Sequence, residues 1–420
     1  MTTKLLFGKL PVNFEESDLK KSQNEGKDLI ARSGKKEGVY TLSSELLEKL
    51  QSPRFAPVWE TNQELAFKPI KPFRHTDRGY FGDPSFDSLF KKTGARKKLL
   101  SPKLGLEIDG LQLSKLTPRQ KDDLALLVEK KGVIVFRNQD FKELSFEDLK
   151  KWGQYYGPLH VHNSSGAPLN EPDFHLIFDF RDKEGKNRFF DRHNSFITWH
   201  SDVTYESQPA GITALAMLQT GEGGDTQFID TIEAYDRLSP TMKVFLDGLQ
   251  AVHTSKEQIE GAKSGGGIER KPIVHTIHPV VRYHPVLKKK ALFVNGSVGG
   301  SLGGFTRKIL GLKDEESDAL LRFLLGHLRT CLDAHIRASW DDKTVVVWDN
   351  RRVIHTATSD LEADSIRHAF RVTPVAERPV ANEKEFNEWT PEKEKELIKH
   401  TQEYLQLTPE EYYNKFYSTK

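Results

Sequence analysis

A histidine and an aspartate two positions apart are the residues of this chain whose types and spacing most clearly offer chemistry. They are His200 and Asp202, in the run Trp-His-Ser-Asp that begins at Trp199. Residues i and i+2 of an extended segment point to the same side, so both side chains can reach one point in space. With a distant histidine they would form a two-histidine, one-carboxylate face, which leaves positions open on non-haem Fe(II) for an organic chelate and O2. His-x-Asp alone also occurs by chance in many proteins, where it binds nothing.

Two arginines further along the chain supply a second kind of site. His355 follows the run Trp-Asp-Asn-Arg that begins at Trp348, and Arg367 and Arg371 come after it. The two arginines are four residues apart on a predicted strand, so both should lie on the same face. A guanidinium group binds carboxylate or sulfonate through paired hydrogen bonds. Two arginines turned inward are costly unless anions compensate them, and we therefore predict an anion site beside the metal site.

Short strands and a few capped helices must position these residues. Thr117 and Gln120 form a capping-box pattern with a proline between them, and Gly132 is placed to end that helix. Four leucines recur with a period of 3.6 in the run that follows residue 313. The sequence predicts helices over 43–50, 117–132, 145–157 and 314–331, and strands over 133–136, 212–218, 291–295 and 345–348.

Composition and charge exclude several classes of protein. The 420 residues are 37% hydrophobic and 10% aromatic, which suffices for a large core and excludes disordered and collagen-like chains. A net charge of +2 offers no broad basic face, so nucleic acid is not an expected partner. The single cysteine, Cys331, excludes an intramolecular disulfide and fits a reducing compartment. The first residues lack a signal-peptide pattern and no apolar run approaches membrane-spanning length, so we expect a cytoplasmic protein without a membrane partner.

One large domain with two additions is the organisation that the sequence favours. We predict an N-terminal arm packed on the core over 1–100, a main domain over 101–378 and a C-terminal helical appendage over 379–420. A basic run at 91–98 is either part of that arm or a binding patch. Two glycine-rich stretches, 261–271 and 296–304, match no phosphate-binding loop and are either covers over a site or surface loops.

Six motifs in a fixed order resemble a known family. They are Trp-His-Ser-Asp-Val-Thr at 199–204, Gly-Gly-Asp-Thr at 223–226, His-Pro-Val-Val-Arg at 278–282, Phe-Val-Asn at 293–295, Trp-Asp-Asn-Arg at 348–351 and Arg-x-x-x-Arg at 367–371. This order is similar to that of the taurine dioxygenase family of Fe(II)- and 2-oxoglutarate-dependent enzymes, and most like its fungal sulfonate dioxygenases. The resemblance covers about 104–376. It implies a mainly β fold with flanking helices (α+β) around a double-stranded β-helix, or jelly roll, whose mouth holds the metal.

The resemblance also implies a reaction. His200, Asp202 and His355 would be the catalytic iron ligands, with O2 and 2-oxoglutarate completing the coordination. Oxidation of 2-oxoglutarate to succinate and CO2 would accompany hydroxylation of the carbon next to sulfur in an organosulfonate. The product would collapse to an aldehyde and sulfite, which suits sulfur scavenging. Members of the family often associate, so a homo-oligomer, a dimer or a tetramer, is expected.

Anion-binding roles follow from the same resemblance. Thr226 and Arg367 would hold the distal carboxylate of 2-oxoglutarate. The substrate-binding groups would be Arg371, His162 and the backbone N–H of Val203, facing a small anionic organosulfonate. Asp349 and Asn350 would either orient the ligands or serve only in a turn.

Departures from the family pattern bear on the substrate. His160 and His162 alternate on a strand-like segment, so only one can face the pocket, and the alignment favours His162. Positions that hold the substrate ammonium in taurine enzymes are Ser165, Ser195 and Phe196 here. Because an ammonium would lack a carboxylate partner, we expect a preference for sulfonates with a neutral, bulky or variable far end. An alkyl sulfate dioxygenase and a non-catalytic anion-binding jelly roll are the alternatives.

Overall fold

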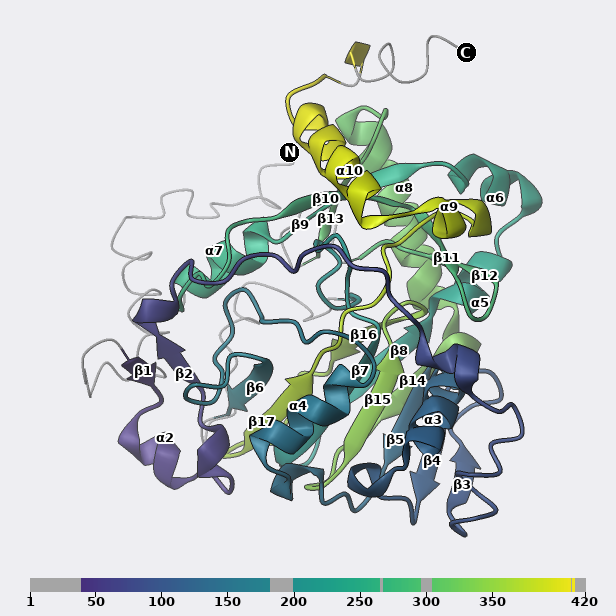
Figure 1. The fold of residues 1–420 in the computed structure, drawn as a ribbon. Helices are drawn as coiled ribbons and strands as arrows, with labels where there is room; N and C mark the ends of the chain where they lie inside the picture. The colour runs from purple at the N-terminus through teal and green to yellow at the C-terminus, as the bar shows by residue number, and fades with distance from the viewer. Residues whose placement is uncertain (1–38, 182–198, 265–266, 296–303, 409, 412–420) are drawn as a thin grey trace, which may run out of the picture.

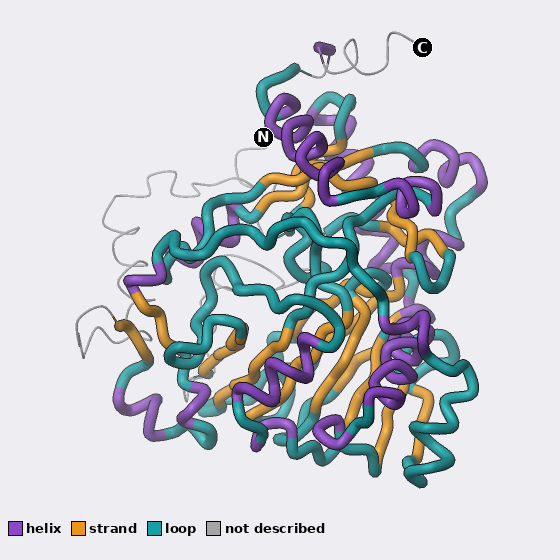
Figure 2. The backbone as a smooth tube through the Cα atoms, in the orientation of Figure 1, coloured by secondary structure: helices purple, strands orange, loops and turns teal. Residues whose placement is uncertain are grey.

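Two facing sheets form the centre of the molecule. The computed structural model describes residues 39–181, 199–264, 267–295, 304–408 and 410–411. Strands of the larger sheet run side by side behind two helices (Figures 1 and 2). In spatial order, this sheet contains β3 (Arg96–Leu99), β4 (Leu106–Asp109), β5 (Val133–Phe136), β15 (Val345–Asp349), β7 (Ile212–Gln219), β17 (Ile366–Val372) and β6 (Phe174–Phe180). Its neighbouring strands are antiparallel except β4 and β5, which are parallel.

A smaller sheet packs against the inner face of the larger one. It contains β14 (His335–Ala338), β8 (Thr226–Asp230) and β16 (Val353–Ala357), in that order. Met217 and Trp348 from the larger sheet share one buried cluster with Phe228, Ile336 and Val353 from the smaller sheet. The layer between the sheets is therefore closed by side chains, as in a jelly roll.

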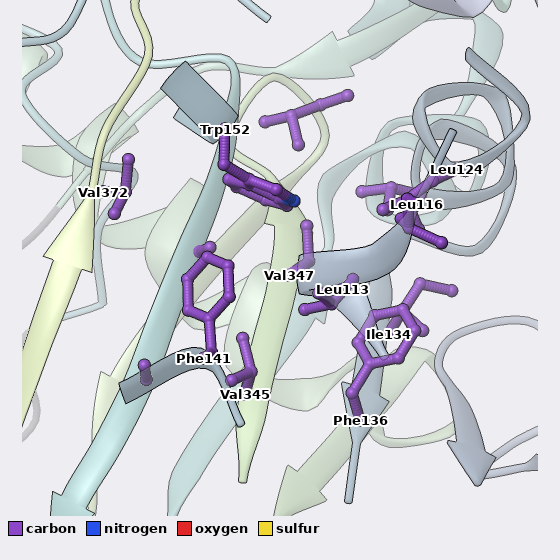
Figure 3. Packing of buried hydrophobic residues seen from close by; sticks show 14 of the residues in the cluster. Leu113, Leu116, Leu124, Ile134, Phe136, Phe141, Trp152, Val345, Val347 and Val372 are labelled. Carbon is purple, nitrogen blue, oxygen red and sulfur yellow. The ribbon is translucent and has the colours of Figure 1, made fainter. Parts of the chain in front are cut away.

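Helices cover the outer face of the larger sheet. α3 (Pro118–Lys131) and α4 (Phe146–Gln154) lie across it (Figure 1). Phe141 and Trp152 meet edge to face with their ring centroids 5.1 Å apart, close to Val345, Val347 and Val372 (Figure 3). This cluster is fully apolar except for the indole N–H, and it holds the outer side of the strands that carry the site.

Local sequence signals explain where the helices begin and end. Thr117 and Gln120 form a reciprocal capping box at the start of α3, and Gly132 ends the helix with φ +74°. The predicted helices at 43–50, 145–157 and 314–331 correspond to α2 (Ser44–Glu48), α4 and α8 (Asp314–Thr330). Predicted strands at 133–136, 212–218 and 345–348 agree with β5, β7 and β15 to within one residue.

The predicted strand at 291–295 is displaced. The strand observed is β12 (Lys289–Leu292), which pairs with β11 (Val281–His284). The Phe293 N–H continues this pairing by donating to the Val280 carbonyl at 2.7 Å, and the Asn295 N–H then donates to the Thr306 hydroxyl at 2.9 Å.

The remaining elements lie around this centre. A third sheet has the order β10 (His275–Pro279), β9 (Gln250–Thr254), β13 (Thr306–Ile309). Four short or peripheral helices are α5 (Thr231–Asp236), α6 (Pro240–Leu246), α7 (Lys256–Ser264) and α9 (Glu383–Glu388). Among the described residues, no helix is both long enough and apolar enough to cross a membrane.

Both ends of the described chain pack on these elements. β1 (Val39–Thr41) pairs with β2 (Val58–Glu60), and Val58 also bridges to Ala167. α10 (Pro391–Tyr404), drawn in yellow in Figure 1, lies beside β10, and Tyr404 joins a buried cluster with Val252 and Ile277. The division into arm, main domain and appendage stays a prediction. Residues 1–38, 265–266, 296–303 and 412–420, with parts of the glycine-rich stretches, lie outside the described residues.

Candidate metal centre and anion pocket

Three residues of metal-binding type converge between the two sheets. His355 lies on β16, and an isolated antiparallel bridge joins it to His200, with N···O distances of 3.0 and 2.8 Å. The Nε2 atoms of His200 and His355 lie 3.8 and 3.7 Å from Asp202 Oδ1. One donor atom from each residue lies within 4.8 Å of the others. Asp202 reaches this point from a turn that follows His200, rather than from the extended strand end that the sequence predicted.

Unpartnered buried atoms make this cluster fit a metal ion. Among the described residues, neither ring nitrogen of His355 has a hydrogen-bond partner. Asp202 Oδ2 has none there either. Burial, followed by the charges of His200, Arg371 and Arg367, holds the pKa of His355 well below its ordinary value. The neutral imidazole is the form that binds metal, so the residues present fit an ion such as Fe(II).

An asparagine fixes the turn that carries Asp202. Asn350 Oδ1 accepts hydrogen bonds from the Asp202 N–H and from the Trp348 indole, both at 3.0 Å. Its Nδ2 donates to Thr213 Oγ1 at 2.8 Å and to the Gly211 carbonyl at 3.2 Å. Of the two residues considered for orientation, Asn350 therefore contacts the ligand turn. Its neighbour Asp349 pairs with His284 and Arg351 instead.

Two further polar side chains hold the same turn. Asn295 Oδ1 accepts from the Ser201 N–H at 3.0 Å, and its Nδ2 donates to Thr204 Oγ1 at 2.7 Å. Ser201 Oγ lies 2.7 Å from the Asn350 carbonyl. Residues from three of the sequence motifs thus support the turn that carries one candidate metal ligand, Asp202.

Val203 has a backbone conformation that β-branched residues rarely adopt. Its φ is +48°, it is buried, and it lines the cavity next to the ligands. Such a conformation costs about 1–3 kcal/mol and persists where surrounding contacts impose it. The contacts of Ser201, Asp202 and Thr204 described above supply that constraint.

A second group of residues forms a buried cationic site beyond the metal cluster. Arg367 Nε donates to the Gly224 carbonyl at 2.9 Å, and its Nη2 lies 3.4 Å from Thr226 Oγ1. The Trp340 indole donates to the same hydroxyl at 3.1 Å. Burial lowers the pKa of Arg367 to about 10, and within the described residues this guanidinium has no carboxylate at ion-pair distance. A buried cation with no paired anion is suited to receive a carboxylate.

The loop before Thr226 requires glycine. Gly223 has φ +80°, and a Cβ there would lie 2.0 Å from the Asp360 carbonyl oxygen. Only a residue without a side chain can make this turn so close to a second backbone. The turn presents the Gly224 carbonyl to Arg367.

Arg371 contacts the metal cluster as well as the cavity. It forms an ion pair through Nη1 with Asp202 Oδ1, and its guanidinium lies 5.2 Å from the centre of the Trp348 ring. The Nε atom has no partner among the described residues. β17 thus presents both arginines on one face, as the spacing predicted, and the contact with Asp202 is one that the sequence did not indicate.

The prediction that only one of His160 and His162 can face the cavity is wrong, since both line it, and they differ in their partners. His162 Nδ1 accepts from the backbone N–H groups of Ser164 and Ser165, at 3.2 and 3.0 Å. An Nδ1 that accepts places the ring proton on Nε2, which leaves a donor for the pocket. His160 Nε2 lies 2.7 Å from Glu206 Oε1, and the buried Lys271 reaches the same oxygen at 3.1 Å.

The cavity also contains residues that sequence reasoning missed. It has a volume of about 90 Å³. Its lining residues are His160, His162, His175, His200, Asp202, Val203, Gln258, Phe305, Arg371 and Thr373. His175, Gln258, Phe305 and Thr373 carried no motif, and only the pairing of β6 with β17 brings His175 to Arg371. Ser195 and Phe196 lie outside the described residues.

Comparisons with known proteins identify the family to which the chain is similar. A family model described as taurine catabolism dioxygenase TauD, TfdA family, matches residues 96–373. An alpha-ketoglutarate-dependent sulfonate dioxygenase of Saccharomyces cerevisiae is 42% identical over 368 residues, which are 87% of this chain and 86% of that protein. An alpha-ketoglutarate-dependent sulfate ester dioxygenase of Pseudomonas putida is 29% identical and covers 66% of this chain and 88% of its own length.

A solved structure gives the same result for the fold. A taurine dioxygenase from Burkholderia xenovorans superposes with a TM-score of 0.54 at 28% identity, over 68% of this chain and 92% of its own. The predicted α+β jelly-roll core is therefore confirmed. The family match extends over more than half of the sequence, and the chain belongs to the taurine catabolism dioxygenase TauD, TfdA family.

Proposed function

We propose that this protein is an Fe(II)- and 2-oxoglutarate-dependent dioxygenase that hydroxylates the carbon next to sulfur in organosulfonates. The products would be sulfite and an aldehyde, with succinate and CO2 from the cosubstrate. The observation that best supports the proposal is that a candidate metal site and a candidate anion site lie side by side. A His-Asp-His cluster, in which His355 and Asp202 Oδ2 have no hydrogen-bond partner among the described residues, lies next to two buried arginines on a single strand.

The residues of the site would have separate roles in binding the metal and the cosubstrate. His200, Asp202 and His355 would hold Fe(II), which together with 2-oxoglutarate and O2 supplies the oxidising chemistry when bound. Arg367 would pair with the distal carboxylate of 2-oxoglutarate, and Thr226 would orient that pair by its hydroxyl.

The substrate anion would lie on the other side of the metal cluster. The donors there would be Arg371, the Nε2–H of His162 and the backbone N–H of Val203. Arg371 also contacts Asp202, so the group that binds the substrate would touch a metal ligand directly. Binding of both molecules would exclude water from the cavity and align the carbon next to sulfur with the metal.

The far end of the substrate is expected to lack a positive charge. Asp202 is the only carboxylate among the described residues that line the cavity. A substrate ammonium would have no free carboxylate to pair with there, so its desolvation would be unfavourable. We therefore propose that sulfonates with a neutral or variable far end are preferred over taurine.

Anaerobic reconstitution tests the proposal. Protein with Fe(II) and 2-oxoglutarate should develop the weak visible charge-transfer band of the chelate, and O2 with a panel of sulfonates should then yield succinate and sulfite in equal amounts. An Arg371→Ala variant should keep the band and lose affinity mainly for the sulfonate. No band in wild-type protein at excess iron would overturn the assignment.

A sulfate ester is the second candidate substrate, since the relative from Pseudomonas putida is named for it. The same arginine and histidine could bind either anion. Release of sulfate rather than sulfite from the panel would move the substrate class to sulfate esters. A cytoplasmic location and assembly as a dimer or tetramer complete the proposal, and light scattering on the purified protein tests the assembly.

A further inference from the structure

A histidine with no assigned role faces the cavity from the edge of the larger sheet. His175 lies on β6 and is paired in register with Arg371 on β17. Its ring stacks on that of His162, with the centroids 4.0 Å apart and the planes inclined by 30°. Both rings and the guanidinium line the same cavity. His175 therefore belongs to the group of residues that surrounds the proposed sulfonate site.

Within the described part of the chain, the hydrogen-bonding capacity of the His175 ring is unused. Neither ring nitrogen makes a hydrogen bond or an ion pair with the described residues, whereas His160 and His162 each have one nitrogen engaged. Burial, followed by the charges of His162 and Arg371, holds the pKa of His175 well below its ordinary value. The ring is therefore neutral and has one N–H to donate.

We propose that His175 donates a hydrogen bond to the substrate sulfonate and, with Arg371 and His162, gives it a third side-chain donor. This inference rests on the proposed function and adds to it. A sulfonate has three terminal oxygens and a carboxylate has two, so a donor added to Arg371, His162 and the backbone N–H of Val203 would favour the sulfonate. His175 would thus contribute to the selection of sulfur oxyanions over carboxylates.

Stacking alone is the competing role for His175. The ring could merely hold His162 in place without touching the substrate, and two variants separate these roles. His175→Phe keeps an aromatic ring against His162 and removes the donor. His175→Gln keeps an N–H donor and removes the ring. A donor role predicts that the Phe variant is the worse binder, and a stacking role predicts the reverse.

Calorimetric titration provides a readout that does not depend on turnover. An alkyl sulfonate, and the alkyl carboxylate of the same chain length, are titrated anaerobically into protein loaded with Fe(II) and 2-oxoglutarate. His175→Phe should raise the sulfonate Kd about tenfold, in line with the loss of one hydrogen bond to an anion, and should change the carboxylate Kd much less. His175→Gln should retain most of the sulfonate affinity. Affinity for 2-oxoglutarate should be unchanged in both variants.

A matched control removes a histidine elsewhere. His327 on α8 bonds to the Ala234 carbonyl at 2.7 Å and does not line the cavity, so His327→Phe should bind both anions as the wild type does. If wild-type protein turns over sulfonate and His175→Phe binds it with unchanged Kd, the inference is wrong and the proposed function stands. If the Gln variant binds worse than the Phe variant, the role is stacking and the inference is again wrong. Wild-type protein that neither binds nor oxidises a sulfonate would overturn the proposed function itself.

Discussion

Asp202 is the residue on which the metal and anion sites depend together. It offers Oδ1 to Arg371 and leaves Oδ2 unpartnered within the described chain. Replacement of either Asp202 or His355 by alanine should abolish iron binding and succinate formation. The two variants should differ in stability, because only Asp202→Ala leaves the buried Arg371 without its carboxylate.

We expect Asp202→Ala to lower the unfolding free energy of the chelator-treated protein by about 3 kcal/mol, the usual cost of breaking a buried ion pair. His355→Ala should cost less, since it removes ring packing on Trp348 and Phe228 and no ion pair. Urea denaturation of the two variants measures the difference. Equal losses would show that breaking the Asp202–Arg371 pair costs no more stability than removing the His355 ring.

Arg367 should determine affinity for the cosubstrate and little else. Its guanidinium is buried with a pKa lowered to about 10, which reflects a cation kept from water without a paired anion. Arg367→Ala should raise the Kd for 2-oxoglutarate by about 10- to 100-fold, equivalent to about 1.5–3 kcal/mol for one charge-assisted interaction. Titration of the visible band against 2-oxoglutarate gives this Kd directly.

A neighbouring arginine provides the control. Arg337 pairs with Asp225 and Asp360 near the same loop and is half exposed. Arg337→Ala removes the same charge without opening the buried site, so it should leave the Kd for 2-oxoglutarate within about twofold. Similar losses in both variants would mean that the general positive field, rather than contact with Arg367, binds the cosubstrate.

At the scale of elements, a single turn between His200 and Tyr205 positions Asp202 in the candidate metal site. Asn350 satisfies two donors and two acceptors around this turn from the end of β15. Asn350→Ala should weaken Fe(II) binding about 10- to 100-fold, as residues that orient metal ligands typically do. Competition with a chromophoric chelator measures the affinity.

Asn382 is a suitable comparison for that variant. It caps α9 at the surface, where its side chain accepts from the Glu385 N–H at 2.9 Å. Asn382→Ala should cost about 1 kcal/mol of stability and leave Fe(II) affinity intact. Unchanged Fe(II) affinity in Asn350→Ala would show that the backbone alone holds Asp202.

The elements also show what the sequence could predict. Helix ends were predictable wherever capping is local, as at Thr117 and Gly132. The two arginines of β17 were predictable because strand periodicity needs no partner. His175 was not, since its place beside Arg371 depends on the register between β6 and β17. The ion pair between Arg371 and Asp202 joins residues 169 positions apart, so the local sequence pattern could not predict it either.

Across the whole molecule, buried charges connect distant segments. Arg351 pairs with Asp77 before the 3-10 helix at Arg78–Phe81, with Glu129 on α3, with Asp349 on β15 and with Glu377 after β17. Arg351 and His284 hold the pKa of Asp349 well below its ordinary value, and Arg351 and Arg282 hold the pKa of Glu377 below its ordinary value. Burial and the charge of Asp77 instead raise the pKa of Glu129 well above its ordinary value. Segments from both ends of the chain thus meet at one internal charge cluster.

Stability of the whole molecule should fall steeply in mild acid because many buried histidines must remain neutral. Burial lowers the pKa of His368 to about 4 and that of His253 to about 3, against about 6.5 in an unfolded chain. Between these values the unfolded state binds more protons than the folded state, so protonation favours unfolding. The sign is therefore a loss of stability as the pH falls from 6.5 to 4, amounting to about 3 kcal/mol for His368 alone.

Replacing His368 tests this directly. It lies on β17, donates from Nε2 to the Phe55 carbonyl at 2.9 Å and does not line the candidate metal cavity, so its titration can be separated from metal binding. His368→Phe should shift the whole stability curve through altered packing and should also flatten its slope by about one proton between pH 6.5 and 4. Urea denaturation of chelator-treated protein at several pH values gives both slopes. Because the shift and the slope are independent, parallel curves for variant and wild type would mean that His368 is protonated in the folded protein and that burial does not control its charge.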